Sequence, residues 1–353
     1  MLTNLKINKN EILYNNSYKI KVFTMEQKDK YNNIITLTYG DCAENHVGMQ
    51  QLGKKEDNGF TMSELISLYK KLRGERGLCE LIILNDFLSD EQLKRVDNTA
   101  GVFVLRNGIN FLFGENVTEK MYLEQNNLEW DKKYWDNRRK KVLNKIKRWN
   151  LCYDEFEQES DLDNGKGSVV HFDRVPFTKK LRELIGKMIG KKGENLRCEG
   201  NNYYDITSGK CGIGWHGDKE RSKVVGVRLG GSGNLSYVWC ENGEEVSRRI
   251  EIKLNRGDIY IMSEKSVGND WLSRKKLTLR HGMETVKGKL LKKITKKVKK
   301  KKNVDRDLIN LLSEISKNDR SVSDGVLKVI KFCVDNNISK EELIKTIQES
   351  IEE

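Results

Sequence analysis

His216 and Asp218, separated by a single glycine, carry two side chains that commonly bind a metal ion. If their segment is extended, alternate side chains point to one face, so both could hold the same ion. An imidazole and a carboxylate suit Fe(II), with further coordination positions supplied from elsewhere. A second pair at this spacing, His171 and Asp173, has no comparable surroundings, and we expect His171 to be structural.

Two arginines in a later segment with strand character, Arg274 and Arg280, are six positions apart. On an extended strand such residues share a face, and two buried guanidinium groups require an anion between them. A dicarboxylate such as 2-oxoglutarate fits, because guanidinium groups bind carboxylates through paired hydrogen bonds. Asn202 and Tyr204 offer an amide and a phenol that could complete the same pocket.

In this order, Asn-x-Tyr, His-x-Asp and Arg-x5-Arg resemble the AlkB-like 2-oxoglutarate- and Fe(II)-dependent oxygenases, in the version encoded by large DNA viruses. The resemblance spans about residues 165–285 and implies a jelly-roll core, or double-stranded β-helix, with iron at its open end and O2 as co-substrate. It also implies two sets of ligands. The iron ligands would include His216 and Asp218, and the 2-oxoglutarate ligands would be Asn202, Tyr204, Arg274 and Arg280.

The third iron ligand is where this sequence departs from the family, which has a second histidine shortly before the first arginine. The corresponding segment, 268–271, contains no histidine, and we expect Asp270 to take that place beside one histidine and one other carboxylate. His281 is the alternative, but it follows Arg280 directly, and an inward Arg280 would turn His281 outward. Without any third protein ligand, the iron site would be weak or inactive.

The expected fold class is α+β, with four parts along the 353 residues. We expect an N-terminal α/β module at 1–125, the oxygenase jelly-roll domain with leading helices at 126–286, a lysine-rich linker at 287–303, and a three-helix appendix at 304–353. The β-rich part of the oxygenase domain contains five short runs of β-branched and aromatic residues between glycine-containing turns. These runs are 223–229, 235–239, 249–254, 258–262 and 275–279.

Three local patterns predict further elements. Thr61 and Glu64 form a capping-box pattern that predicts a helix over 62–73. Asn107-Gly108 between two apolar runs, 102–106 and 109–113, predicts a β-hairpin. Apolar residues at helical spacing within the basic segment 132–148 predict an amphipathic helix with a charged outer face.

The formal net charge of +13 is concentrated in residues 287–302, which hold ten lysines and no acid. Such a run is typical of a nucleic-acid or nuclear-import segment, although a solvated linker without a partner has the same composition. We expect it to bind phosphate groups regardless of base sequence. The tether residues are Lys292, Lys293, Lys296, Lys297, Lys299, Lys300, Lys301 and Lys302.

The sequence shows no apolar run long enough for a membrane span and no secretion signal, and its seven cysteines form no Cys-x-x-Cys pair. These features favour an intracellular protein of the cytoplasm or nucleus, in an infected host cell if the viral resemblance holds, with no membrane partner. His46, close to Asp41 and Glu44, could line the catalytic entrance or bind a metal, but hydrogen bonding within a turn is the simpler interpretation.

The function that these patterns favour is oxidative demethylation or hydroxylation of nucleic-acid bases with Fe(II), 2-oxoglutarate and O2. A base must be flipped or single-stranded to enter such a site. Two alternatives stay open: a catalytically silent oxygenase fold that binds nucleic acid or serves as a virion component, and an oxygenase acting on protein side chains.

Overall fold

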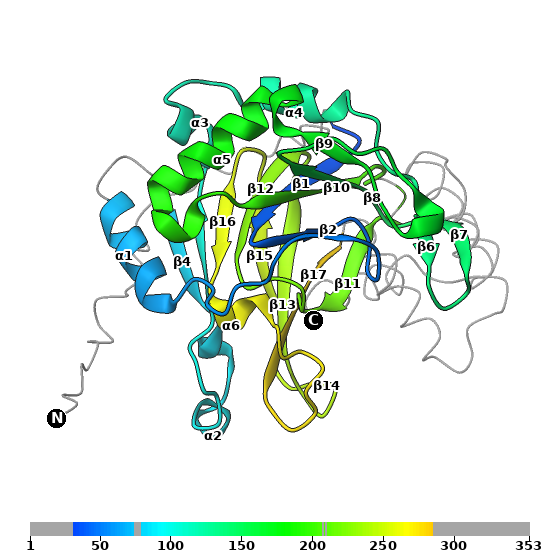
Figure 1. Ribbon diagram of the computed structural model, residues 1–353. Coiled ribbons are helices and arrows are strands. Elements are labelled where there is room, and N and C mark those ends of the chain that lie inside the picture. The colour runs from blue at the N-terminus through cyan, green and yellow to red at the C-terminus, as the bar shows by residue number, and fades with distance from the viewer. Residues whose placement is uncertain (1–30, 74–78, 207, 209, 285–353) are drawn as a thin grey trace, which may run out of the picture. The chain divides into compact units, whose positions relative to one another are not determined.

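The computed structural model describes residues 31–73, 79–206, 208 and 210–284, which form a strand-rich α+β structure with curled, mainly antiparallel sheets (Figure 1). The larger sheet has the order β4-β5-β16-β12-β1-β10-β8-β9, and the smaller has the order β11-β17-β13-β14, with β15 also paired to β13. The larger sheet consists of β4 (Cys79–Ile83), β5 (Gly101–Leu105), β16 (Ile259–Met262), β12 (Val224–Gly230), β1 (Ile34–Gly40), β10 (Arg197–Tyr203), β8 (Trp149–Asp154) and β9 (Val169–His171). The smaller consists of β11 (Gly212–His216), β17 (Thr278–Glu284), β13 (Gly233–Glu241), β14 (Glu244–Glu245) and β15 (Ile250–Leu254).

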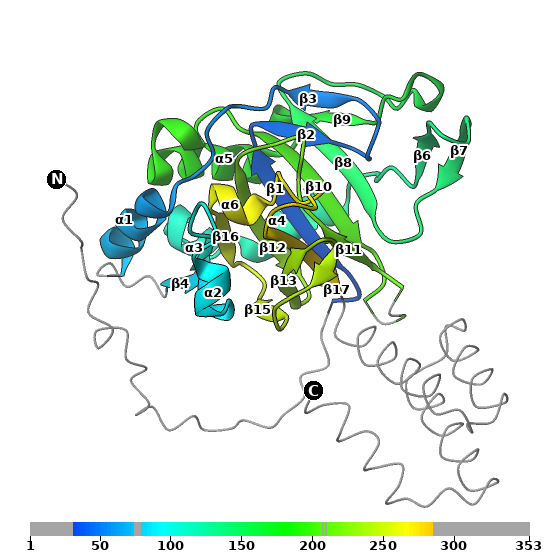
Figure 2. The same ribbon diagram turned by 90° about the horizontal axis from the view of Figure 1, so that it is seen from below.

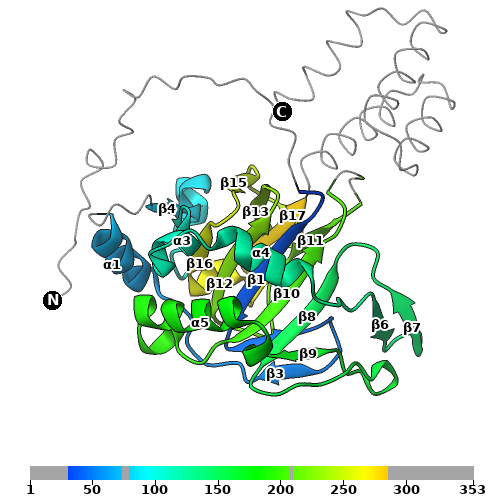
Figure 3. The same ribbon diagram turned by 90° about the horizontal axis from the view of Figure 1, so that it is seen from above.

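Helices cover the face of the larger sheet that turns away from the smaller one (Figure 3), and the view from below shows β11, β13 and β17 on the opposite side (Figure 2). Alternation along β12 explains this layering, because Val225, Val227 and Leu229 pack in one buried cluster with Met121 and Leu181 of the helices. The helices of this layer are α1 (Met62–Leu72), α3 (Gly108–Phe113), α4 (Thr118–Asn126) and α5 (Pro176–Ile189). The short helices α2 (Asp90–Leu93) and α6 (Glu264–Val267) do not contribute to this cluster.

A second buried cluster lies between the two sheets and is the core of the β-rich half. Val224 and Tyr260 of the larger sheet pack there with Tyr237 and Trp239 of β13. Trp239 is fully buried, and its indole N–H donates to the carbonyl oxygen of Leu84 at 2.9 Å. Both faces of the larger sheet are therefore buried, which explains why β12 reads as an almost continuous apolar run.

The capping box and most of the expected strands are confirmed. The Thr61 side chain accepts from the Glu64 N–H and the Glu64 carboxylate accepts from the Thr61 N–H, which begins α1 at Met62. The runs 223–229, 235–239, 249–254 and 258–262 correspond to β12, β13, β15 and β16, whereas the fifth, 275–279, is displaced because β17 begins at Thr278.

The expected hairpin around Asn107 is wrong, because β5 leads into the helix α3 and not into a second strand. Asn107 has a φ of 50°, its N–H donates to Asp258 Oδ1 at 3.0 Å, and the Ile109 N–H donates to the Gly257 carbonyl oxygen at 3.0 Å. These long-range contacts attach the turn to the loop before β16.

The expected helix over 132–148 is also wrong, because this segment forms the hairpin of β6 (Lys133–Asp136) and β7 (Lys141–Asn144). Asp136 Oδ1 accepts from the N–H groups of Arg138 and Arg139, and Lys140 has a φ of 50°. This turn reverses the chain where helical periodicity would have continued it. A second hairpin joins β2 (Cys42–Glu44) to β3 (Gln51–Gly53).

The larger sheet contains strands from both sides of residue 125, where we expect the N-terminal module to end. Strands β1, β4 and β5, all from the 1–125 segment, belong to the same sheet as β10, β12 and β16. The larger sheet therefore combines strands from both sides of residue 125, whereas the smaller sheet comes entirely from the 126–286 segment. The expected linker, 287–303, and appendix, 304–353, lie outside the described residues. Among the residues described, no helix combines the length and apolar character needed to cross a bilayer.

Candidate metal centre

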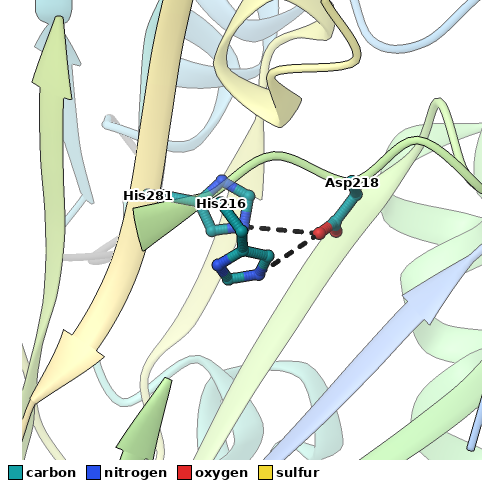
Figure 4. A group of neighbouring side chains, drawn as sticks. All are labelled: His216, Asp218 and His281. Atoms are coloured by element: carbon teal, nitrogen blue, oxygen red, sulfur yellow. Dashed lines mark ion pairs between the residues drawn. The ribbon is translucent and has the colours of Figure 1, made fainter. Parts of the chain in front are cut away.

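His216, Asp218 and His281 lie together at the edge of the smaller sheet, with one potential ligand atom from each within 4.8 Å of the others (Figure 4). The Nε2 atoms of both histidines are 3.5 Å from Asp218 Oδ1, and their rings are 4.4 Å apart between centroids. No comparable cluster of three histidine, cysteine or carboxylate groups occurs elsewhere in the described part of the chain.

Strand pairing brings the two histidines together. His216 ends β11 and is opposite His281 of the antiparallel strand β17, while Tyr237 of β13 is opposite His281 on its other side. Tyr237 belongs to the core between the sheets, and directly opposed residues share a face, so His281 also points between the sheets. His281 is buried, with 6% of its surface exposed.

Asp218 is held by the turn that follows α6. Its N–H donates to the Val267 carbonyl oxygen at 3.0 Å, and the Asn269 amide donates to the Asp218 carbonyl oxygen at 2.6 Å. Gly217 packs so closely here that a Cβ atom would lie 2.0 Å from the Gly268 carbonyl oxygen. The glycine between His216 and Asp218 is therefore required by this close contact.

The electrostatics of His216 and Asp218 favour the protonation states in which each can bind a metal. His216 Nδ1 lies 2.8 Å from the Gly214 carbonyl oxygen, so the proton belongs on Nδ1 and Nε2 faces Asp218 with its lone pair. Burial and the neighbouring His281 lower the pKa of His216 to about 4, so the ring is neutral at pH 7. Burial alone would raise the pKa of Asp218, but His281 and Arg221 hold that pKa well below its ordinary value.

A buried ionic network surrounds the carboxylate. Arg221, with only 4% of its side chain exposed, is ion-paired to Glu199, to Glu220 at 2.9 Å and to Asp218 at 3.6 Å. Burial would lower the pKa of Arg221, but the three carboxylates raise it well above its ordinary value. Asp218 is thereby kept ionised and oriented toward the two imidazoles.

Two imidazoles and one carboxylate that converge from one side form the ligand set typical of non-haem Fe(II) oxygenases with open coordination positions. The donors therefore fit the iron that the sequence resemblance implies. His281 Nδ1 is buried and has no hydrogen-bond partner among the described residues.

Asp270, the expected third ligand, lies outside the cluster of His216, Asp218 and His281. Asp270 Oδ2 pairs with Lys265 Nζ at 2.7 Å, and Asp270 does not belong to the cluster. Arg280 and His281 are consecutive on β17 and therefore lie on opposite faces of the strand. Because Arg280 points away from the core between the sheets, His281 points toward that core and the cluster.

The two expected arginines also lie elsewhere. Arg274 is exposed in the turn before β17. Arg280 lies with its guanidinium carbon 5.5 Å from the centroid of the Trp271 ring, on the face of β17 opposite His281. The structure therefore does not bring these guanidinium groups to the candidate metal ligands.

Asn202 and Tyr204, the expected 2-oxoglutarate ligands, do not face the metal cluster. Their chain neighbours Asn201 and Tyr203 lie on the face that does. Asn202 accepts from the Asn33 amide on the helix-covered face, and Tyr204 stacks on Trp149 at 4.2 Å between centroids. The neighbours Asn201 and Tyr203, which form the same Asn-x-Tyr spacing, point to the other face, where the Asn201 amide donates to Glu199 at 3.0 Å. A shift of one residue exchanges the faces of a strand.

The remaining two histidines lie outside the cluster. His171 caps a short 3-10 helix (Phe172–Arg174) through its Nδ1, which accepts from the Asp173 N–H, in agreement with a structural role. His46 stacks on Tyr134 of β6 at 3.7 Å between centroids, and burial lowers its pKa to about 4. The tether lysines lie outside the described residues.

The fold and this cluster define a class, an α+β protein with a candidate metal centre at the edge of its smaller sheet. Over 248 residues the chain is 42% identical to the uncharacterized protein R156 of Acanthamoeba polyphaga mimivirus, and the match covers 70% of this chain and 94% of that protein. The chain therefore belongs to the same family as this mimivirus protein. No family model matches the sequence.

Proposed function

We propose that this chain is a 2-oxoglutarate- and Fe(II)-dependent oxygenase of the AlkB-like type that oxidises nucleic-acid bases. The observation that carries the proposal is the convergence of His216, Asp218 and His281 on one point with both imidazole Nε2 atoms facing the carboxylate. When bound there, iron with O2 and 2-oxoglutarate supplies the oxidation of a C–H bond, with succinate and CO2 as co-products. His216, Asp218 and His281 would hold the ion, which would leave other coordination positions for the co-substrate.

The path of the chain supports a jelly-roll core. From β10 onward the chain passes between the two sheets, with β10, β12 and β16 in the larger and β11, β13, β15 and β17 in the smaller. Antiparallel strands that alternate between two facing sheets are typical of jelly rolls.

A basic, aromatic surface on the β6–β7 hairpin supports nucleic acid as the substrate. Its exposed cations are Lys132, Lys133, Arg138, Arg139, Lys140, Lys141 and Lys147. Aromatic side chains accompany them, because Tyr134 stacks on His46 and Lys132 Nζ lies 4.7 Å from the centroid of Trp149. Cations together with stacking surfaces are the features that bind single-stranded nucleic acid with little dependence on sequence.

This hairpin is connected to the strand that carries the metal cluster. The Gly212 N–H at the start of β11 donates to the Lys147 carbonyl oxygen at 3.2 Å, and His216 ends the same strand. Four residues of strand span about 13 Å, which is within reach of a nucleotide held on the hairpin. The mimivirus relative supports a viral protein.

The test is turnover by the full chain with Fe(II), 2-oxoglutarate and ascorbate on single-stranded oligonucleotides carrying N-methylated bases. We expect succinate formation coupled to loss of a methyl group or gain of one oxygen atom, measured by mass spectrometry, and loss of both in Asp218→Asn. Oxidation of a peptide with no change in any oligonucleotide would instead identify a protein oxygenase. Absence of iron binding would favour the silent fold.

The hairpin is tested separately by binding. Replacing Arg138 and Arg139 by glutamine should weaken binding of a single-stranded oligonucleotide and reduce the slope of log K against log salt by about 0.7 for each lost phosphate contact. A matched variant, Lys70→Gln with Lys71→Gln on α1, removes the same charge from another element and should leave that slope unchanged. Equal effects of the two variants would contradict a role for the hairpin.

A further inference from the structure

Arg228 is a buried cation in the middle of β12, between Val227 and Leu229. Only 1% of its surface is exposed, and no ion pair joins it to any residue that the structure describes. Its Nε has no hydrogen-bond partner, and its Nη1 contacts only the Met283 sulfur, at 3.2 Å. Burying a charged group without a partner is strongly unfavourable, so this environment calls for an anion.

The groups around Arg228 do not neutralise it. Its titratable neighbours are the phenols of Tyr260 and Tyr203 and the carboxylate of Asp258. Burial raises the pKa of both phenols, so they are neutral at pH 7. Asp258 is already paired with Arg106 at 2.6 Å. Burial accordingly lowers the pKa of Arg228, in contrast to the paired Arg221.

A second unsatisfied polar group lies beside the guanidinium. Thr36 of β1 is directly opposite Arg228 in the strand pairing, so the two side chains share a face. The Thr36 hydroxyl is buried and has no hydrogen-bond partner within the described structure. A carboxylate placed there could accept from both side chains.

The same strand that supplies His281 contacts Arg228. Met283, which touches the guanidinium, is two residues after His281, and their partners Leu235 and Tyr237 both belong to the core between the sheets. Residues two apart on one face of a strand are separated by about 7 Å. The guanidinium of Arg228, in contact with Met283, therefore lies about one such step from His281. A short dicarboxylate with one end at the metal cluster spans a comparable distance.

We propose that Arg228, with Thr36, binds the distal carboxylate of the 2-oxo acid, in the place that the sequence had assigned to Arg274 and Arg280. The identity of the oxo acid rests on the proposed function, whereas the anion site itself rests on the unpartnered guanidinium. Arg228 and Thr36 then select dicarboxylic over monocarboxylic oxo acids.

The test is isothermal titration calorimetry on the full chain loaded with Mn(II), a redox-stable substitute for Fe(II). Two oxo acids are compared: 2-oxoglutarate and 2-oxopentanoate, which has a methyl group in place of the distal carboxylate. We expect wild type to prefer 2-oxoglutarate by at least tenfold and Arg228→Met to bind both acids alike with Mn(II) affinity unchanged. Thr36→Val should lose part of the preference, and Arg274→Met should retain it.

The outcomes separate this inference from the proposed function. Unchanged preference in a folded, Mn(II)-binding Arg228→Met protein would overturn the inference and leave the oxygenase proposal standing. In a second outcome, wild type does not bind Mn(II), but glutarate raises the melting temperature of wild type and not that of Arg228→Met. This outcome would support the anion site and refute the oxygenase proposal. If no carboxylate binds wild type by either measurement, the anion site is wrong.

Discussion

Replacing His281 should remove most of the stabilisation that a bound metal provides, because it removes one of three donors that lie within 4.8 Å of each other. A metal at one hundred times its dissociation constant stabilises a protein by about 2.7 kcal/mol. For a folded body of this size, each kcal/mol raises the melting temperature by about 2–4 °C, so wild type should gain about 5–10 °C.

His281→Gln preserves much of the side-chain volume, so the protein should still fold. We expect at least a hundredfold loss of affinity, since even removing a residue that only orients a ligand costs about 10–100-fold. At the same metal concentration the remaining stabilisation is then about 0.4 kcal/mol, or about 1 °C. The assay is thermal unfolding of the full chain with and without Mn(II), compared as a difference within each variant.

Asp270→Asn is the matched comparison, because the sequence favoured Asp270 as the third ligand. Its carboxylate pairs with Lys265 at 2.7 Å and is about one-third exposed, so losing this pair should cost about 0–1 kcal/mol in both metal states. The Mn(II)-induced increase should therefore match wild type. If Asp270→Asn loses the increase while His281→Gln keeps it, the geometric argument for His281 is refuted.

Three further predictions concern other parts of the chain. Burial raises the pKa of Glu44 from 4.5 to about 7, so the folded state favours the protonated carboxyl and its stabilising contribution is lost as pH rises from 4.5 through 7. Because the Glu44 carboxyl is partly exposed and screened by solvent, Glu44→Gln should reduce the fall in urea-unfolding free energy between pH 5 and 8 by about 1 kcal/mol, and an unchanged pH profile would contradict this. In Gly226→Ala, the new Cβ would lie 1.9 Å from Tyr260 Cζ, so urea denaturation should show a loss of about 1–3 kcal/mol, and wild-type stability would disprove the close contact. Deleting 287–302 should reduce the log–log salt slope of duplex binding, measured by fluorescence anisotropy, by about 0.9 per lost phosphate contact, whereas an equal slope would exclude phosphate binding by the lysines.

The sequence predicts the local elements of the β-rich half and two of the three candidate ligands. Short runs of β-branched and aromatic residues predict β12, β13, β15 and β16, because each strand has at least one buried face. The capping box at Thr61 specifies the start of α1 from short-range contacts alone. The spacing of His216 and Asp218 was informative because a single glycine fixes their separation.

The errors arise where one residue decides the face of a strand. Asn201, Asn202, Tyr203 and Tyr204 contain the Asn-x-Tyr spacing in two frames, and only the pairing of β10 with β1 decides which frame points between the sheets. The same ambiguity applies to β17, where we expect Arg280 to face the site and the structure places His281 there instead. Arg228 did leave a signal, a lone arginine within the apolar run of β12.

The position of β1 makes the pairing of this strand dependent on two strands that lie in the second half of the chain. Ile34 of β1 pairs with Tyr203 of β10 on one side and with Gly230 of β12 on the other. Both partner strands are synthesised more than 150 residues after β1. Such non-local pairing raises contact order and slows folding, and an unpaired strand exposes its edges meanwhile. During synthesis, β1 must remain unpaired with these neighbours until β10 and β12 have left the ribosome, which makes this stage the one at which a chaperone would help most.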